Sequence, residues 1–131
     1  MDQDRRSFKI HRKNPFLDED VWNIAKRVPC HDELIRYTWW HNHAIEVARR
    51  SNLPVHTFFY EDYETSWNRT VEELFRFLSL SPAQGATPLL FVPGKHYMEY
   101  YERSDTAMAE RLVQTMASRE TWTLLQHYFS Q

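Results

Sequence analysis

Two adjacent acids follow the most apolar run of the chain, and their position could serve chemistry. The run is VHTFFY, Val55–Tyr60, and Glu61 and Asp62 come directly after it. Carboxylates at the carboxyl end of a strand can hold a metal beside bound phosphates. That arrangement needs a glycine-rich phosphate loop, and the only glycines are Gly85 and Gly94. The pattern therefore favours a second role, in which the acids accept hydrogen bonds from backbone N–H groups in a turn.

Histidines and the single cysteine offer little to a metal ion. His41 and His43 are two residues apart, so on a helix they point to different faces and cannot share one metal. We expect His41 on the core side of its helix. Cys30 and His31 have no partners at zinc-site spacing. One cysteine also excludes an internal disulfide.

Clustered aromatic residues leave two interpretations open. They are Trp39, Trp40, Tyr97, Tyr100 and Tyr101. Such residues could form an aromatic cage around a ligand. Aromatic residues at helical spacing more often pack a core, so the pattern favours a structural role.

The elements around the two acids are predicted from residue types and spacing. Val55–Tyr60 is rich in β-branched and aromatic residues, which predicts a strand covered on both faces, as in a parallel sheet. A helix follows, with one apolar face formed by Val71, Leu74, Phe75 and Leu78. Its start fits a capping box of Thr70 with Glu73, and an earlier start could be capped by Ser66 or Asn68.

Residues 1–17 are expected to form an irregular lead-in. In residues 18–131 we expect four further helices. They are Asp18 to Val28, His31 to Arg50, Ser104 to Ala117, and a last helix capped by Ser118. The second of these has a predicted apolar stripe of Leu34, Tyr37, His41, Ala44, Ile45 and Ala48.

Composition limits the function classes. The 131 residues carry 16 basic and 18 acidic side chains, a net charge of -2, so no global field attracts nucleic acid or an anionic membrane. We expect no signal peptide or membrane-spanning segment within these residues. One strand is too few for a sheet. We therefore expect an α/β fold present only in part, the helix-rich back half of a larger domain with an incomplete parallel sheet.

Several stretches resemble the sulfotransferase family. LPVHTFFYEDY followed by TVEELFRFLSL is similar to a strand-turn-helix of that family, and RYTWWHNHAIEVARRSNLPV is similar to the helix that feeds the strand. FVPGKHYMEYY and MASRETWTLLQHYF are similar to its C-terminal part. The resemblance covers roughly residues 29–131. It implies a P-loop NTPase-like α/β fold and transfer of sulfonate from 3'-phosphoadenylyl sulfate (PAPS) to a hydroxyl or amine.

The resemblance also implies two roles in binding the co-substrate. Tyr60 matches a residue that contacts the adenine, and Lys95, after Gly94, matches a region that supplies a basic group to the 3'-phosphate. Both residues also have plain interpretations: Tyr60 as a core tyrosine, and Lys95 as a solvated lysine, which is favoured. The family's phosphosulfate loop and catalytic base are absent. The stretch RKNPF is only weakly similar to its 3'-phosphate motif. No catalytic residue is assigned, and this chemistry requires no metal.

The first functional expectation is that the chain forms the C-terminal part of a PAPS-dependent sulfotransferase and is inactive alone. Its partners would be the nucleotide and an unknown acceptor. The alternative is a non-catalytic module, either a degenerate sulfotransferase-like domain or a helical interaction protein. An exposed apolar surface near Val55 to Phe59 would favour self-association.

Overall fold

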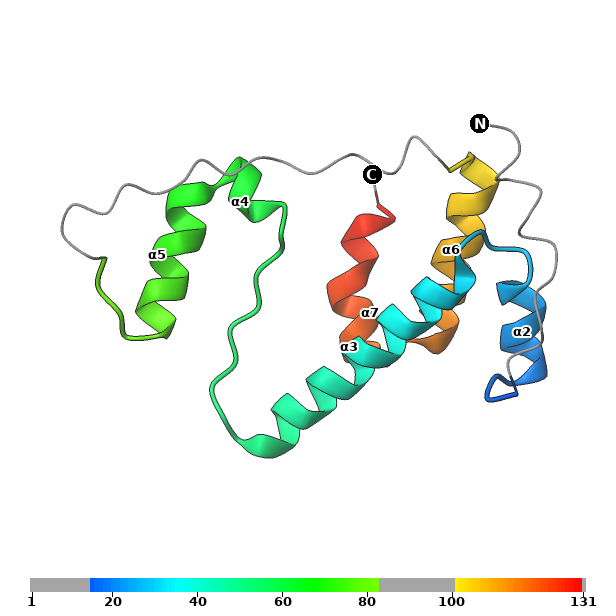
Figure 1. Ribbon diagram of the computed structural model, residues 1–131, viewed down its shortest axis with the longest axis horizontal. Coiled ribbons are helices and arrows are strands. Elements are labelled where there is room, and N and C mark those ends of the chain that lie inside the picture. Colours follow the sequence, from blue (N-terminus) through cyan, green and yellow to red (C-terminus); the bar gives the residue numbers. More distant parts are fainter. Residues whose placement is uncertain (1–14, 83–100, 131) are drawn as a thin grey trace. The chain divides into compact units, whose positions relative to one another are not determined.

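The computed structural model describes residues 15–82 and 101–130, and within these ranges the regular elements are all helices (Figure 1). The chain divides into two units, which are considered separately. The first comprises Met1–Asn52 with Tyr97–Gln131, and the second is Leu53–His96. The prediction of an α/β fold with an incomplete parallel sheet is wrong, because the described residues contain no strand.

Val55–Tyr60 does not form the expected strand, because the described residues offer no neighbouring strand. A strand satisfies its backbone by pairing, and the described residues contain no second strand that could pair with it. Its rings instead contact the helices of the second unit. His56 stacks on Phe77 at a centroid distance of 5.4 Å, and Phe58 meets Tyr63 edge-on at 5.4 Å. His56 and Phe58 therefore pack against helices, while Val55 stays exposed.

Among the described residues of the first unit there are four α-helices and one short 3₁₀-helix. The four α-helices are α2 (Glu19–Ala25), α3 (His31–Ser51), α6 (Arg103–Met116) and α7 (Arg119–Leu125), and the 3₁₀-helix is η2 (Gln126–Tyr128). α3 packs against α6 and α7, and α2 packs against α6. Each predicted helix of this unit is confirmed, although α2 and α7 are shorter than expected. None of the described helices is long and apolar enough to cross a bilayer.

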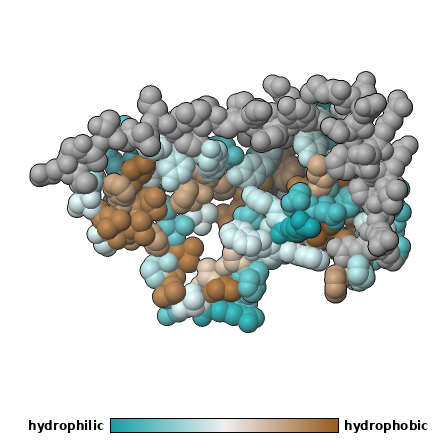
Figure 2. Space-filling view, viewed as in Figure 1, coloured by the Kyte–Doolittle hydropathy of each residue, from teal (hydrophilic) through white to brown (hydrophobic). Residues whose placement is uncertain are grey.

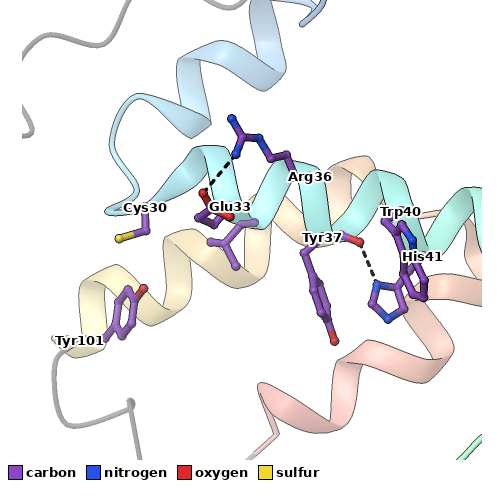
Figure 3. A pocket seen from close by; sticks show the side chains of 8 residues that line it. Cys30, Glu33, Arg36, Tyr37, Trp40, His41 and Tyr101 are labelled. Atoms are coloured by element: carbon purple, nitrogen blue, oxygen red, sulfur yellow. Dashed lines mark hydrogen bonds and ion pairs between the residues drawn. The ribbon is translucent and has the colours of Figure 1, made fainter.

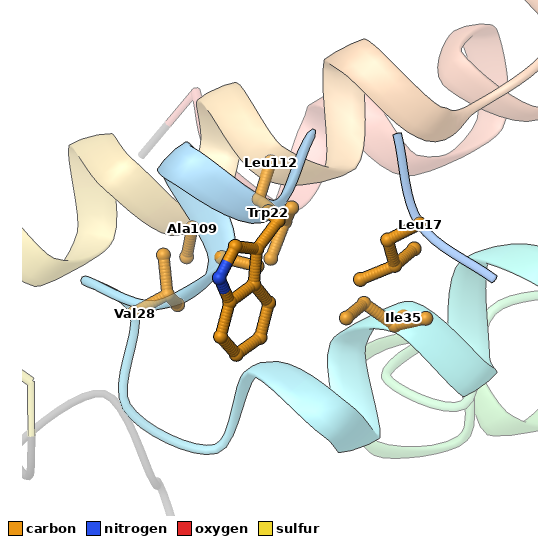
Figure 4. Close-up of a cluster of buried hydrophobic side chains, with 7 residues drawn as sticks. Leu17, Trp22, Val28, Ile35, Ala109 and Leu112 are labelled. Carbon is orange, nitrogen blue, oxygen red and sulfur yellow. The ribbon is translucent and has the colours of Figure 1, made fainter. Parts of the chain in front are cut away.

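A cluster of buried apolar side chains holds the first unit together (Figure 4). Its members are Leu17, Trp22, Ala25, Val28, Ile35, Ala109 and Leu112. Figure 4 shows the Trp22 indole among side chains of three helices and the turn after α2. Burying one large apolar side chain stabilises a fold by about 1.5–3 kcal/mol, so these contacts dominate the packing. Leu17, at the end of the predicted lead-in, is part of this core.

The buried face of α3 differs from the predicted stripe. The fully buried positions are His31, Ile35 and Thr38, whereas Tyr37 is exposed and His41 is half-buried. Polar residues can occupy this face because their polar atoms are satisfied locally. The Thr38 hydroxyl donates to the Leu34 carbonyl at 2.7 Å, and His31 Nδ1 lies 3.1 Å from the Val28 carbonyl.

The turn between α6 and α7 is fixed by side chains. Asn42 on α3 donates from Nδ2 to the Met116 carbonyl at 2.9 Å, and its Oδ1 accepts from the Ser118 backbone N–H at 2.8 Å. Ser118 caps α7 as predicted, because its Oγ accepts from the Thr121 N–H at 3.1 Å. One asparagine thus joins a helix end and a helix start to α3.

The second unit contains α4 (Asp62–Thr65) and α5 (Trp67–Phe77). α5 begins earlier than the Thr70 and Glu73 capping box requires, with Ser66 at its N-cap. Thr70 is instead buried inside the helix pair, and its hydroxyl contacts the carbonyls of Asp62 and Ser66 at 3.2 and 3.1 Å.

Candidate functional site

The longest helix, α3, carries the candidate site. Cys30 precedes it in the left-handed region at φ 55, and Asn52 ends it at φ 54. Asparagine tolerates that region well, which suits the end of a helix. Acidic residues in the first turn and Arg49 and Arg50 in the last turn complement the helix dipole. These features fix the ends of the helix and therefore the positions of the side chains along it.

A shallow groove of about 520 Å³ runs along α3, and we call it the α3 groove. Its lining residues are Cys30, Glu33, Leu34, Arg36, Tyr37, Trp40, His41 and Tyr101. Figure 3 shows Cys30 and Tyr101 at one end and Tyr37, Trp40 and His41 at the other. All eight residues belong to the first unit.

Three rings at one end of the groove contact one another. The His41 ring lies 4.1 Å from the Tyr37 ring and 4.8 Å from the Trp40 ring, between ring centroids. His41 Nδ1 lies 2.8 Å from the Tyr37 carbonyl, and a carbonyl only accepts, so Nδ1 carries the proton. This bond fixes the imidazole plane, against which Trp40 lies edge-on. The cluster presents an ordered aromatic surface.

At the other end, Tyr101 lies beside the free thiol of Cys30. Partial burial raises the pKa of the Tyr101 phenol above its ordinary value, and the charge of Cys30 and its hydrogen bond with the phenol add to the rise. Cys30 itself is exposed.

Charge at the groove is confined to one ion pair. Arg36 Nη1 lies 3.4 Å from Glu33 Oε1, and both side chains are largely exposed. Exposed pairs of this kind contribute about 0–1 kcal/mol, so both groups remain available to a partner. The described residues hold no group of three His, Cys, Asp or Glu side chains suited to a metal. Apart from Cys30 and this ion pair, the groove is lined by apolar and aromatic side chains.

Of the sequence-predicted site residues, the structure describes only Tyr60. Tyr60 belongs to the second unit and is 57% exposed, so it is not a core tyrosine. Gly94 and Lys95 lie outside the described residues. The expected meeting of Tyr60 with Lys95 therefore stays a prediction.

The turn after Tyr60 confirms the local prediction for the Asp62 carboxylate, while that for the Glu61 carboxylate stays a prediction. Asp62 Oδ2 accepts a hydrogen bond from the Phe59 backbone N–H at 3.2 Å. The Glu61 carbonyl also accepts from the N–H groups of Glu64 and Thr65 at 3.1 and 3.2 Å. Asp62 thus shapes the turn with its carboxylate, while Glu61 does so with its backbone.

Sequence reasoning missed the α3 groove because it placed the helix at the wrong rotation. The predicted stripe places Tyr37 and His41 on the core side, and the aromatic spacing favours a core role for Trp39, Trp40 and Tyr101. Trp39 and Trp40 are in fact 41% and 65% exposed. The buried face of α3 includes His31 and Thr38, whose polar atoms are hydrogen-bonded locally, and the aromatic residues therefore face outward. Polarity alone would have placed these two residues on the surface.

Comparison of the chain with protein-family models, with curated proteins and with solved structures finds no match.

Proposed function

We propose that this chain is a helical module that binds another polypeptide through the α3 groove. The observation that carries the proposal is Trp40, a tryptophan 65% exposed yet ordered by contact with His41 in a groove wall. Exposing a large aromatic ring to water is unfavourable, and burying it beneath a partner recovers that free energy. Exposed aromatic clusters of this kind mark interaction sites.

The composition of the groove suits a protein partner. Tryptophan, tyrosine and arginine dominate the binding energy of protein interfaces, and the groove presents Trp40, Tyr37, Tyr101 and Arg36 together. Its 520 Å³ can accept a few side chains. We infer that the partner supplies apolar or aromatic anchors on a short segment, with Glu33 and Arg36 meeting polar groups at the edge.

Adjacent tryptophans provide a matched test. Peptides selected by display on the 131-residue chain should bind Trp40→Ala roughly 30-fold more weakly, because removing a central interface tryptophan costs about 2 kcal/mol or more. Trp39→Ala is the control, since Trp39 is also exposed but does not line the groove. Fluorescence anisotropy gives both affinities. Equal losses for the two variants, or no selectable peptide, would rule out the α3 groove as the binding site.

A second candidate function is co-substrate binding in a sulfotransferase-like protein. The observation that favours it is the exposed Tyr60 ring, which follows an apolar run and precedes a turn shaped by Asp62. Such a ring can stack on a purine, and stacking contributes about 1–3 kcal/mol. In this proposal Lys95 and Gly94 meet the 3'-phosphate of PAPS, as the sequence resemblance implies.

Nucleotide titration tests the second candidate separately. In the chain, or in a longer protein containing it, Tyr60→Ala should weaken binding of 3'-phosphoadenosine 5'-phosphate roughly tenfold, while Tyr60→Phe keeps the ring and the affinity. Lys95→Ala should weaken that ligand more than adenosine 5'-phosphate, which lacks the 3'-phosphate. Undetectable binding, or equal losses for the two nucleotides, contradicts this candidate.

A further inference from the structure

The segment that joins α3 to α4 contains a stretch of unpaired backbone, residues 55–58, which we call the open segment (Figure 1). Within the described part of the chain, its N–H and C=O groups form no backbone hydrogen bond, and they fall in neither a helix nor a strand. In solution, backbone groups without such a partner are expected to hydrogen-bond to water. Four consecutive residues with unpaired donors and acceptors offer the same pattern as the edge of a sheet.

Side chains of the open segment alternate as they do in a strand. His56 and Phe58 lie on one side, with ring centroids 6.0 Å apart, and contact Phe77 and Tyr63 respectively. Val55 and Thr57, between and beside them, are exposed, and Val55 is 59% exposed. Figure 2 shows apolar surface on the second unit, gathered mostly over α5. One face is therefore anchored on the unit's own helices, while the other face and the backbone are open.

We propose that the open segment binds the exposed sheet edge of a partner protein by adding to it as a strand. The partner must present backbone donors and acceptors at strand spacing, because only these pair with all the open groups. A helix has already used its own backbone groups and cannot do so. The residue types support the pairing, since valine, threonine and phenylalanine favour strands, and Pro54 is allowed at the first position of a strand.

A second copy of the chain fits this segment less well. The described residues supply no other strand, so two copies would form only a two-stranded ribbon. Such a ribbon is marginally stable in water, whereas a partner sheet of three or more strands gives the added strand a stable template. The geometry therefore points to a partner that already has a sheet.

Amide hydrogen exchange of the full chain tests the proposal. The probe is a synthetic three-stranded antiparallel sheet peptide whose open edge carries valine and threonine, added at millimolar concentration. Edge-strand residues bond to the neighbour at every second position. We expect amide exchange to slow by at least roughly tenfold at alternate residues, either 55 and 57 or 56 and 58. The amides at these positions would form hydrogen bonds to the probe, which protect them from exchange with water.

Three controls make the outcome decisive. The same probe with its edge amides N-methylated keeps its side chains but loses its donors, and it should give no protection. Thr57→Gly should weaken binding roughly fivefold through lost strand propensity, and Thr57→Val should retain it. Trp40→Ala should bind the probe as the unaltered chain does, which separates this test from that of the α3 groove. Unchanged exchange, protection without alternation, equal protection by both probes, or protection without any probe overturns the proposal.

Discussion

The Asn42 side chain forms hydrogen bonds to residues far away in the sequence. It donates to Met116 and accepts from Ser118, residues 74 and 76 positions away in the sequence. Asn42→Ala removes both bonds and leaves two partly buried backbone groups unpaired, so we expect a loss of about 1–3 kcal/mol in the free energy of unfolding. Urea denaturation of the two proteins measures the difference.

The control for Asn42 is another asparagine on a helix. Asn23 accepts a hydrogen bond from Lys26 at 2.7 Å, but both groups are exposed. Asn23→Ala should therefore change the free energy of unfolding by less than about 0.5 kcal/mol. Similar effects of the two substitutions would show that Asn42 does not fix the turn between α6 and α7.

Glu46 provides a prediction on pH at the same scale. Hydrogen bonds from Arg49 and Arg50 lower the pKa of its carboxyl from 4.5 to about 2. Since the folded pKa lies below the unfolded value, any linked stability is complete above 4.5 and is lost as the pH falls towards about 2. Solvent screening keeps that stability small. A carboxyl ¹³C NMR titration should give the low midpoint, and replacing both arginines with alanine should restore it to near 4.5.

At the scale of elements, helices were well predicted because their signals are local. Periodic apolar residues gave the positions of α3 and α6, and Ser118 marked the start of α7. A strand signal is different, since Val55–Tyr60 has strand composition but pairing depends on residues far away. The rotation of α3 also escaped prediction, because only tertiary packing shows that His31 and Thr38 are buried.

The end of α5 offers a prediction at this scale. Ser79 lies in the left-handed region at φ 55, its N–H bonds to the Arg76 carbonyl at 3.2 Å, and the Leu80 N–H bonds to the Phe75 carbonyl at 2.9 Å. This is the Schellman ending, in which glycine avoids the steric cost of that region. Ser79→Gly should therefore stabilise the second unit by up to about 1 kcal/mol.

Alanine at the same position is the matched control for Ser79. Ser79→Ala keeps a Cβ atom in the left-handed region, so it should give no gain. The thermal unfolding midpoint of each variant, followed by circular dichroism, measures the effect. A gain from alanine equal to that from glycine would mean that Ser79 is unstrained.

For the whole molecule, the sequence predicted where the helices lie along the chain. It did not predict which helix faces are buried and which are exposed. Fold class depends on how elements pair, and a strand-like run such as Val55–Tyr60 forms a sheet only where other strands can pair with it. The α3 groove could not be derived, because only tertiary packing shows that Tyr37 and Trp40 face outward and that Tyr101 lies beside Cys30. Tyr60 shows the opposite case, in which a local turn was predicted correctly while its role stays a prediction.

Indole N–H signals in the NMR spectrum test binding at the α3 groove most directly. The chain has five tryptophans, and single Trp→Phe variants assign the signals of Trp39 and Trp40. On titration with a peptide selected by display, the Trp40 signal should shift with the binding curve while the Trp39 signal stays in place. The two residues are neighbours and both are exposed, but only Trp40 lines the groove. A Trp40 signal that does not move, or equal shifts at both residues, would contradict the account.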